Sequence, residues 1–162
     1  MTFVGLKKYI SPLLLSLLVM GAGFAEQTDL DILGKALEKA LGEKTNYGAP
    51  RIISIQKAAA RGEHVLFVAV HVNRHFTSAG LRNNVLTDAA SILRIAKSWG
   101  WSDRIAKVFI VENLVPEGKE QAHPVFSCSV SASVLAKVDW GSLNQNEVLN
   151  RLDQAEFHEV KK

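Results

Sequence analysis

The segment from residue 83 to residue 99 has the clearest helical periodicity in the sequence. At 100° per residue, its apolar side chains fall within one arc of about 140°, and polar side chains occupy the other side. The arc contains Leu81, Val85, Leu86, Ala89, Ile92, Leu93, Ala96 and Trp99. Gly100 follows directly, where the end of a helix favours a positive φ. A helix this one-sided must pack on another layer of structure, which sets the architecture we expect.

Two apolar strands are expected on each side of this helix in the sequence. Residues 51–57 and 65–73 precede it, and the second of these segments is apolar on both faces, which is typical of a central strand. Residues 106–115 form a third apolar strand, and a fourth begins near His123. Because the connection within each pair is short, we expect two hairpins and a largely antiparallel sheet.

Further helices are expected at both ends of the chain. Residues 28–41 carry leucines at helical spacing, with Thr28 as the expected N-cap. This line of leucines either packs on its own domain or is presented to another protein. Residues 144–155 begin with the Asn-x-x-Glu spacing of a capping box. A short helical turn is expected after Ser131.

The sequence therefore predicts one small α+β domain with the element order α-β-β-α-β-β-α. In this domain the central helix covers one face of a four-stranded, mainly antiparallel sheet. We expect the domain to span residues 51–156. An N-terminal helix and linker, residues 26–50, precede it, and residues 157–162 form a loose tail.

Residues 1–25 have the three parts of a secretory signal peptide. Lys7 and Lys8 give a positive start, a leucine-rich run follows, and small residues precede a cleavage point at Glu26. The alternative is an uncleaved membrane anchor. The apolar run of about 16 residues is, however, shorter than a membrane-spanning helix, which needs about 20 residues. We expect export to the periplasm or out of the cell, with no stable membrane span after cleavage.

Most of the excess of basic over acidic residues lies in this leader. The formal net charge is +3, but Lys7 and Lys8 lie in the leader, which has no acidic residue. The rest of the chain is nearly neutral. It lacks the polybasic footprint of a nucleic-acid-binding protein, so we expect no nucleic-acid partner.

The single cysteine, Cys128, cannot form an internal disulfide. It alternates with Phe126 and Val130 on the apolar side of the fourth strand, while serines occupy the other side. A thiol in such a position has a raised pKa and is unreactive. We interpret Cys128 as a free core residue, and the fold as one held by an ordinary hydrophobic core.

No pattern indicates a metal, a cofactor or covalent catalysis. His71 and His75 are four residues apart, but four residues of strand span about 13 Å, too far for one ion unless the chain turns sharply. The sequence has no nucleophile elbow and no phosphate-binding loop of the usual spacing. Glu112, near the end of an apolar strand, is a candidate functional acid, although a carboxylate facing water is the simpler interpretation. We expect no cofactor.

Polar residues gather in residues 74–84, between the second strand and the central helix. Helix N-termini bind anions through free N–H groups, and nearby arginines strengthen such binding. The candidate binding residues are Arg74, His75, Phe76, Arg82 and Asn83. The alternative is that a polar side chain here only caps the helix and that the arginines are solvated.

The leading hypothesis is an exported, non-enzymatic module that binds another protein, as an accessory component of the cell envelope or of a secretion assembly. The alternative is a small periplasmic hydrolase or anion-binding protein that uses residues 74–84. A stable protein partner would favour the first hypothesis. A bound small ligand or activity on a hydrolase panel would favour the second.

Overall fold

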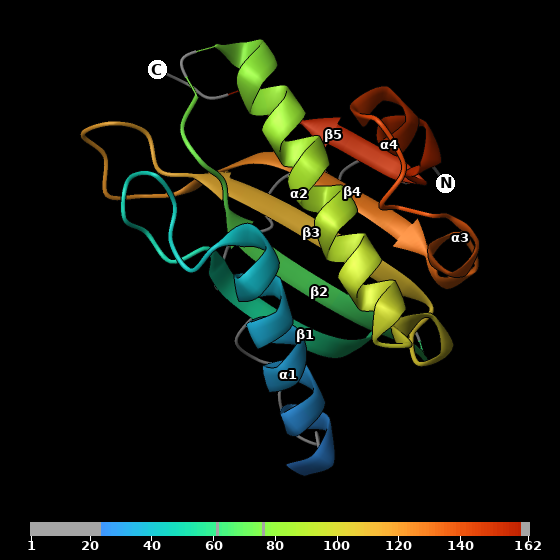
Figure 1. Cartoon of the computed structure of the whole chain (residues 1–162). Coiled ribbons are helices and arrows are strands. Elements are labelled where there is room, and N and C mark those ends of the chain that lie inside the picture. Colours follow the sequence, from blue (N-terminus) through green and yellow to red (C-terminus); the bar gives the residue numbers. More distant parts are fainter. Residues whose placement is uncertain (1–23, 61, 76, 160–162) are drawn as a thin grey trace, which may run out of the picture.

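The computed structural model describes residues 24–60, 62–75 and 77–159, and it contains one five-stranded sheet crossed on one face by two long helices (Figure 1). The strands are β1 (Ile52–Ala60), β2 (Glu63–His71), β3 (Lys107–Leu114), β4 (His123–Ser131) and β5 (Gln154–Phe157). The helices are α1 (Phe24–Leu41), α2 (Ser78–Ser98), α3 (Ala132–Lys137), α4 (Gln145–Arg151) and the short 3-10 helix η2 (Trp101–Asp103). The predicted α+β class is confirmed. The predicted count of four strands is wrong.

The strands lie in the order β1-β2-β3-β4-β5, which is also their order in the sequence. Neighbours are antiparallel except β2 and β3, which are parallel because α2 carries the chain back across the sheet between them. Both predicted hairpins are present. Gly62 and Gly118 lie in their connections at φ of 83° and 71°, a left-handed conformation that glycine adopts without a steric cost. The sheet is therefore mainly antiparallel, as predicted.

Helix α2 begins at Ser78, earlier than predicted, because Thr77 caps it. The Thr77 hydroxyl accepts a hydrogen bond from the N–H of Gly80 at 3.0 Å. The predicted apolar side of the helix is buried, and Leu93 is fully enclosed. Leu81 is only partly buried, and Trp99 has half of its surface exposed. Trp99 is the C-cap, and its φ of −93° and ψ of 10° depart from helical values. The 100° rotation per residue therefore no longer predicts the direction of its side chain.

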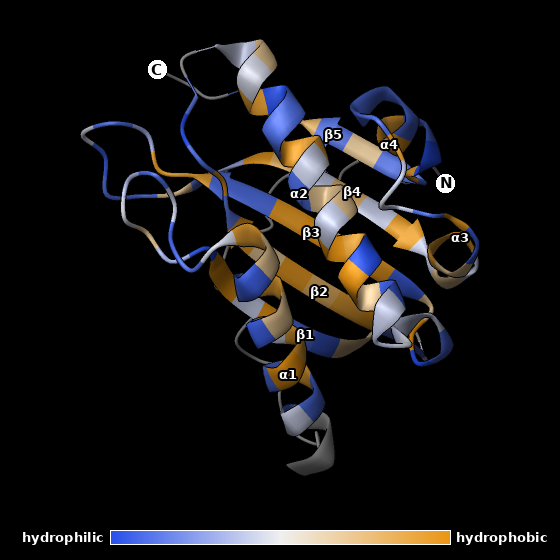
Figure 2. Cartoon of the chain, viewed as in Figure 1, coloured by the Kyte–Doolittle hydropathy of each residue, from blue (hydrophilic) through white to orange (hydrophobic). Residues whose placement is uncertain are grey.

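The hydrophobic core lies between α1, α2 and the side of the sheet that faces them (Figure 2). The buried strand residues on this side are Leu66, Val68, Val70, Val108, Ile110, Phe126, Cys128 and Val130. The expected core position of Cys128 is thus confirmed, and burial raises the pKa of its thiol. The leucine line of α1, represented by Leu33 and Leu37, is buried in the same core. This helix therefore packs on its own domain.

Helix α1 begins at Phe24, so the expected N-cap at Thr28 is wrong. The predicted signal peptide, residues 1–25, lies outside the described residues apart from Phe24 and Ala25. No helix in the described part of the chain is long and apolar enough to cross a membrane.

The C-terminal segment differs most from the prediction. Helix α4 is shorter than residues 144–155, although its capping box between Asn144 and Glu147 is confirmed. The chain then adds β5 to the edge of β4. Phe157, predicted to lie in a loose tail, packs against Phe126 with ring centroids 4.7 Å apart. The expected helical turn after Ser131 is present as α3.

Candidate ligand groove at the start of helix α2

The loop between β2 and α2 is tied to the loop that precedes β1. The backbone N–H of Asn46 donates to Oδ1 of Asn73 at 2.9 Å. The side-chain amide of Asn46 donates to the carbonyl of Arg74 at 2.9 Å, and its Oδ1 accepts from the N–H of Arg74 at 2.9 Å. These side-chain bonds to the backbone fix the path of the chain as it approaches α2.

Arg74 belongs to this supporting structure. Its Nε donates to the carbonyl of Val115 at 2.9 Å, and its Nη2 donates to the carbonyl of Pro116 at 3.1 Å. Its guanidinium also lies 4.3 Å from the ring centroid of Tyr47. Arg74 thereby links three loops at one end of the sheet. These contacts favour a structural role for Arg74 over the anion-binding role expected from the sequence.

A groove of about 690 Å³ lies beside the first turns of α2. Its apolar lining comes from α2, from the ends of β3 and β5, and from β4, through Leu81, Val85, Leu114, Val125 and Phe157. Its main polar lining residues are His75, Thr77, Ser78, Arg82, His158 and Glu159. Ligand sites commonly combine an apolar surface with a few polar groups in this way.

Arg82 is the charged side chain that belongs most directly to this groove. It projects from α2, is exposed, and its guanidinium lies 4.0 Å from the ring centroid of Phe157. This is a cation–π contact across the groove. Arg82 makes no hydrogen bond to another described residue. Its N–H groups therefore remain free to bond an anionic group in the groove.

The structure separates the five predicted binding residues. His75 and Arg82 both line the groove. Arg74 is engaged with neighbouring loops, and the exposed Asn83 does not line the groove. Phe76 lies outside the described residues.

His158 is a site residue that the sequence did not reveal. Its N–H donates to the carbonyl of Val125 at 2.9 Å, and its Nε2 lies 3.0 Å from Oγ of Ser127. Its Nδ1 is 3.7 Å from the carboxylate of Glu156. A serine, a histidine and an acid are the side chains of a hydrolase triad. Here, however, the last distance exceeds hydrogen-bond length, and Ser127 lies inside the sheet, paired with both β3 and β5.

Charged side chains are also buried beneath α2, on the core side of the groove. Nη2 of Arg51, just before β1, lies 2.6 Å from Oδ2 of Asp88 on α2, and both residues are buried, at 1% and 7% exposure. A second guanidinium nitrogen, Nη1, donates to the carbonyl of His71 at 2.7 Å, and the third, Nε, is buried without a hydrogen-bond partner among the described residues. The side-chain amide of Asn84 donates to Asp88 at 2.9 Å. This buried ion pair joins α2 to the start of the sheet.

Glu112 lies in the same layer, so the expectation that it faces water is wrong. It is fully buried, because the even-numbered positions of β3 face α2 and carry its apolar neighbours Val108 and Ile110. Both carboxyl oxygens lack a hydrogen-bond partner among the described residues. Burial raises the pKa of Glu112 well above its ordinary value, the charge of Asp88 raises it further, and Arg51 partly opposes the shift. Burial also raises the pKa of Asp88, against the lowering effect of Arg51.

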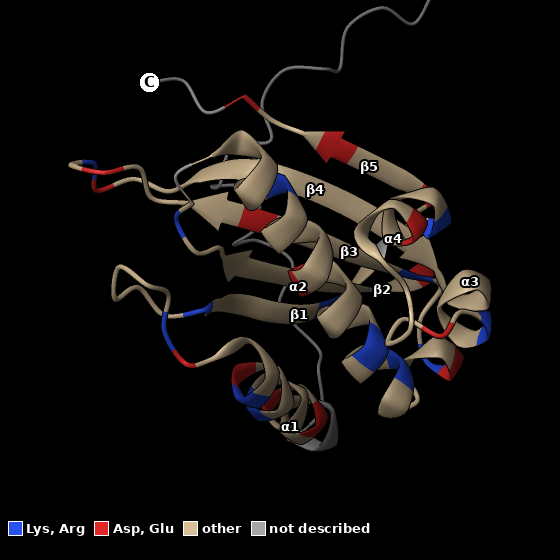
Figure 3. Ribbon diagram, turned by 45° about the horizontal axis from the view of Figure 1, so that its top comes forward, with Lys and Arg blue, Asp and Glu red and all other residues tan. Residues whose placement is uncertain are grey.

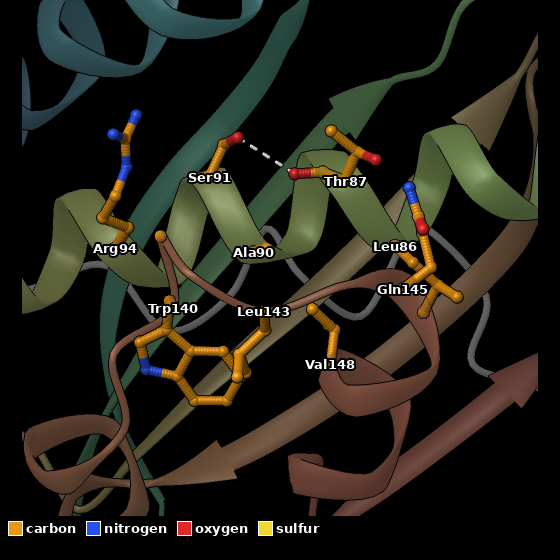
Figure 4. Close-up of a pocket in the computed structure, with 10 residues that line it drawn as sticks. Leu86, Thr87, Ala90, Ser91, Arg94, Trp140, Leu143, Gln145 and Val148 are labelled. Atoms are coloured by element: carbon orange, nitrogen blue, oxygen red, sulfur yellow. Dashed lines mark hydrogen bonds between the residues drawn. The ribbon is translucent and has the colours of Figure 1, made fainter.

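A second, smaller hollow of about 310 Å³ lies between α2 and the segment that joins α3 to α4 (Figure 4). In Figure 4, Thr87, Ser91 and Arg94 project from the side of α2 opposite Trp140 and Val148. The hydroxyl of Ser91 donates to the carbonyl of Thr87 at 2.9 Å. Because this polar group is satisfied within the helix, the hollow is a weaker candidate than the groove.

The charged residues of the described part are of mixed sign. Figure 3 shows basic and acidic segments close together along α1 and around α3. This mixture does not form the basic stripe that follows a nucleic-acid backbone.

No group of three or more side chains in the described residues is arranged to hold a metal ion. The ring Nδ1 of His71 bonds the carbonyl of Pro50 at 2.8 Å.

Comparison with known proteins finds no family model, no curated protein and no solved structure that matches this chain. The groove and the side chains around it are therefore the basis for inferring its function.

Proposed function

We propose that this protein is an exported, non-enzymatic binding module that holds a segment of another protein in the groove at the start of α2. The observation that carries the proposal is the combination of an apolar surface with the unbonded guanidinium of Arg82 in one groove. The segment that fits best has an aromatic or branched aliphatic side chain next to a carboxylate. Burial of the apolar side chain supplies affinity, and Arg82 supplies a charge-assisted hydrogen bond.

The position of β5 favours an extended protein segment over a small ligand. Strand β5 is at the edge of the sheet, paired only with β4, and Phe157 at its end lines the groove. An unpaired strand edge offers backbone N–H and C=O groups to an added strand. A partner segment that runs along β5 gains backbone hydrogen bonds while one of its side chains enters the groove. The signal-peptide features of residues 1–25 support the exported location.

A random peptide library displayed on phage tests this function. The wild-type protein should enrich peptides in which an aromatic or branched aliphatic residue adjoins Asp or Glu. Arg82→Glu should abolish this enrichment, because it places like charges together. Arg94→Glu is the matched control, since Arg94 is exposed on the same helix but does not line the groove. Equal enrichment by all three proteins would place binding elsewhere.

A small hydrolase remains the second candidate, favoured by the 3.0 Å contact between Ser127 and His158. If this pair were catalytic, His158 would activate the Ser127 hydroxyl as a nucleophile. A fluorophosphonate probe should then label the wild-type protein and fail to label Ser127→Ala. The binding function instead predicts no labelling of either protein. The location of Ser127 within a strand that is paired on both sides favours the second result.

A further inference from the structure

Three buried ionisable groups from different parts of the chain, Arg51, Asp88 and Glu112, interact electrostatically beneath α2, and their hydrogen bonding is unequal. Asp88 on α2 receives hydrogen bonds from Arg51 at 2.6 Å and from Asn84 at 2.9 Å. Glu112 on β3 receives none from the described residues, although both of its carboxyl oxygens are buried. The guanidinium of Arg51 bonds Asp88 through Nη2 and the carbonyl of His71 through Nη1, and its buried Nε has no hydrogen-bond partner among the described residues. No hydrogen bond joins it to Glu112 in the described part of the chain.

The surroundings of Glu112 are apolar. The residues paired with it on the neighbouring strands are Val70 on β2 and Phe126 on β4, both fully buried. An ionised carboxylate without hydrogen-bond donors is strongly disfavoured in such a place, and the group binds a proton instead. The charge of Asp88 acts in the same direction, because two nearby carboxylates resist ionising together.

We propose that Glu112 is a buried proton-binding site, which keeps its proton at neutral pH in the folded protein while Asp88 stays ionised against Arg51. Both carboxylates lie close in sequence to residues that line the groove. Glu112 is two residues before Leu114, and Asp88 is one turn after Val85, and both Leu114 and Val85 line the groove. The proton therefore allows Glu112 to stay buried on the side of β3 that faces the core. This inference does not depend on what the groove binds.

Titratable and charged groups from several elements act on this site. Asp88 faces Glu112 from α2, and Arg51 faces it from the segment before β1. His75, in the loop before α2, acts on Asp88 and lowers its pKa. Cys128 on β4 is affected by Glu112. Burial raises the pKa of its thiol, and the charge of Glu112 raises it further. Of these, only Asp88 and Arg51 act directly on Glu112.

The proton makes stability depend on pH with a definite sign. In the unfolded chain Glu112 loses its proton near the ordinary value of 4.5, whereas in the folded chain the pKa is raised well above that value. The stabilisation from the bound proton is complete below about pH 4.5 and is lost as pH rises toward the folded-state pKa. Across this window the unfolding equilibrium constant should rise about tenfold per pH unit through Glu112.

Carbon-13 NMR of the full chain with labelled glutamate carboxyl groups tests the site directly. At about pH 7 the wild-type protein should show one glutamate carboxyl resonance at the protonated position. That resonance should be missing from Glu112→Gln, whose amide replaces the protonated carboxyl with the same shape. A wild-type spectrum in which every glutamate carboxyl titrates near its ordinary value would overturn the proposal, even if the variant failed to fold.

Denaturant unfolding at a series of pH values gives an independent readout. As the pH rises from about 5, the unfolding equilibrium constant of the wild-type protein should increase about tenfold per pH unit relative to that of Glu112→Gln. Glu117→Gln, at an exposed position in the β3–β4 turn, is the control and should follow the wild-type curve. Parallel curves for wild-type and Glu112→Gln would show that Glu112 is ionised in the folded protein.

Discussion

The sequence was least informative about the burial of individual polar residues. The periodicity of α2 identifies which side of the helix is buried, but it does not indicate that Asp88 lies on that side. Asp88 is tolerated there because Arg51, 37 positions earlier in the chain, is held against it. Glu112 was expected at the surface because it lies close to the end of a strand. Its burial instead follows the alternation along β3 that it shares with Val108 and Ile110. Only for Asp88 is the deciding contact distant in sequence.

Cys128 is the residue whose environment the sequence predicted correctly, and its reactivity follows from that environment. The thiol is buried beside Ile110, and burial raises its pKa, so little thiolate is present. A thiol reagent should label the native protein slowly and the denatured protein completely. Rapid labelling under native conditions would mean that this side of β4 opens to solvent.

Among the helices and strands, the longer ones were predicted and the shortest strand was not. Helix α2 and strands β1 to β4 each contain eight or more residues, enough for a period of 3.6 or 2 to be visible. Strand β5 has four residues, and it exists because β4 provides a partner. The groove was only half predicted for this reason, since the loop before α2 was recognised but the segment carrying Phe157 and His158 was assigned to a loose tail.

The packing of α2 on the sheet should dominate stability. Leu93 is fully buried within the core. Leu93→Ala should lower the free energy of unfolding by about 2–5 kcal/mol, because it removes buried methyl groups and leaves a cavity. Arg94→Ala, at the exposed neighbouring position, should change it by less than about 0.5 kcal/mol. Urea denaturation measures both. An unchanged midpoint for Leu93→Ala would contradict the buried position of this side chain.

Strand β5 should contribute both to stability and to binding. Phe157→Ala removes the ring that contacts Phe126 and Arg82, and it should cost about 1–2 kcal/mol because the side chain is only partly buried. The same change should weaken binding of any peptide selected by the groove. Glu156→Ala is the control, as this side chain is exposed on the same strand. Equal effects of both changes on stability would argue against a specific role for the Phe157 ring.

At the scale of the whole molecule, the sheet has helices α1 and α2 on one side (Figure 1). A groove lies at one end of α2. Hydrophobic patterning predicted this two-layer arrangement. The exact site could not be predicted, because it is formed by segments that only the fold brings together, namely the start of α2, the end of β3 and the end of β5.

The proposed export makes a prediction about the mature chain. Cleavage before Glu26 removes only the first two described residues of α1, Phe24 and Ala25, and leaves its buried leucines from Leu30 onwards intact. Intact mass spectrometry of the protein recovered from the periplasm or medium should therefore match a chain that starts at Glu26, or within a residue or two of it. A full-length chain recovered from the membrane fraction would contradict the signal-peptide interpretation.

We propose that the groove beside α2 is the binding site of this protein. The most direct test is an NMR titration of the ¹⁵N-labelled protein with a peptide enriched from the library. The chemical-shift changes should be confined to the start of α2, residues 77–85, and to the ends of β3 and β5 around Leu114 and Phe157. Changes centred on the opposite face of the sheet, around Phe67 and Phe109, would contradict binding in the groove.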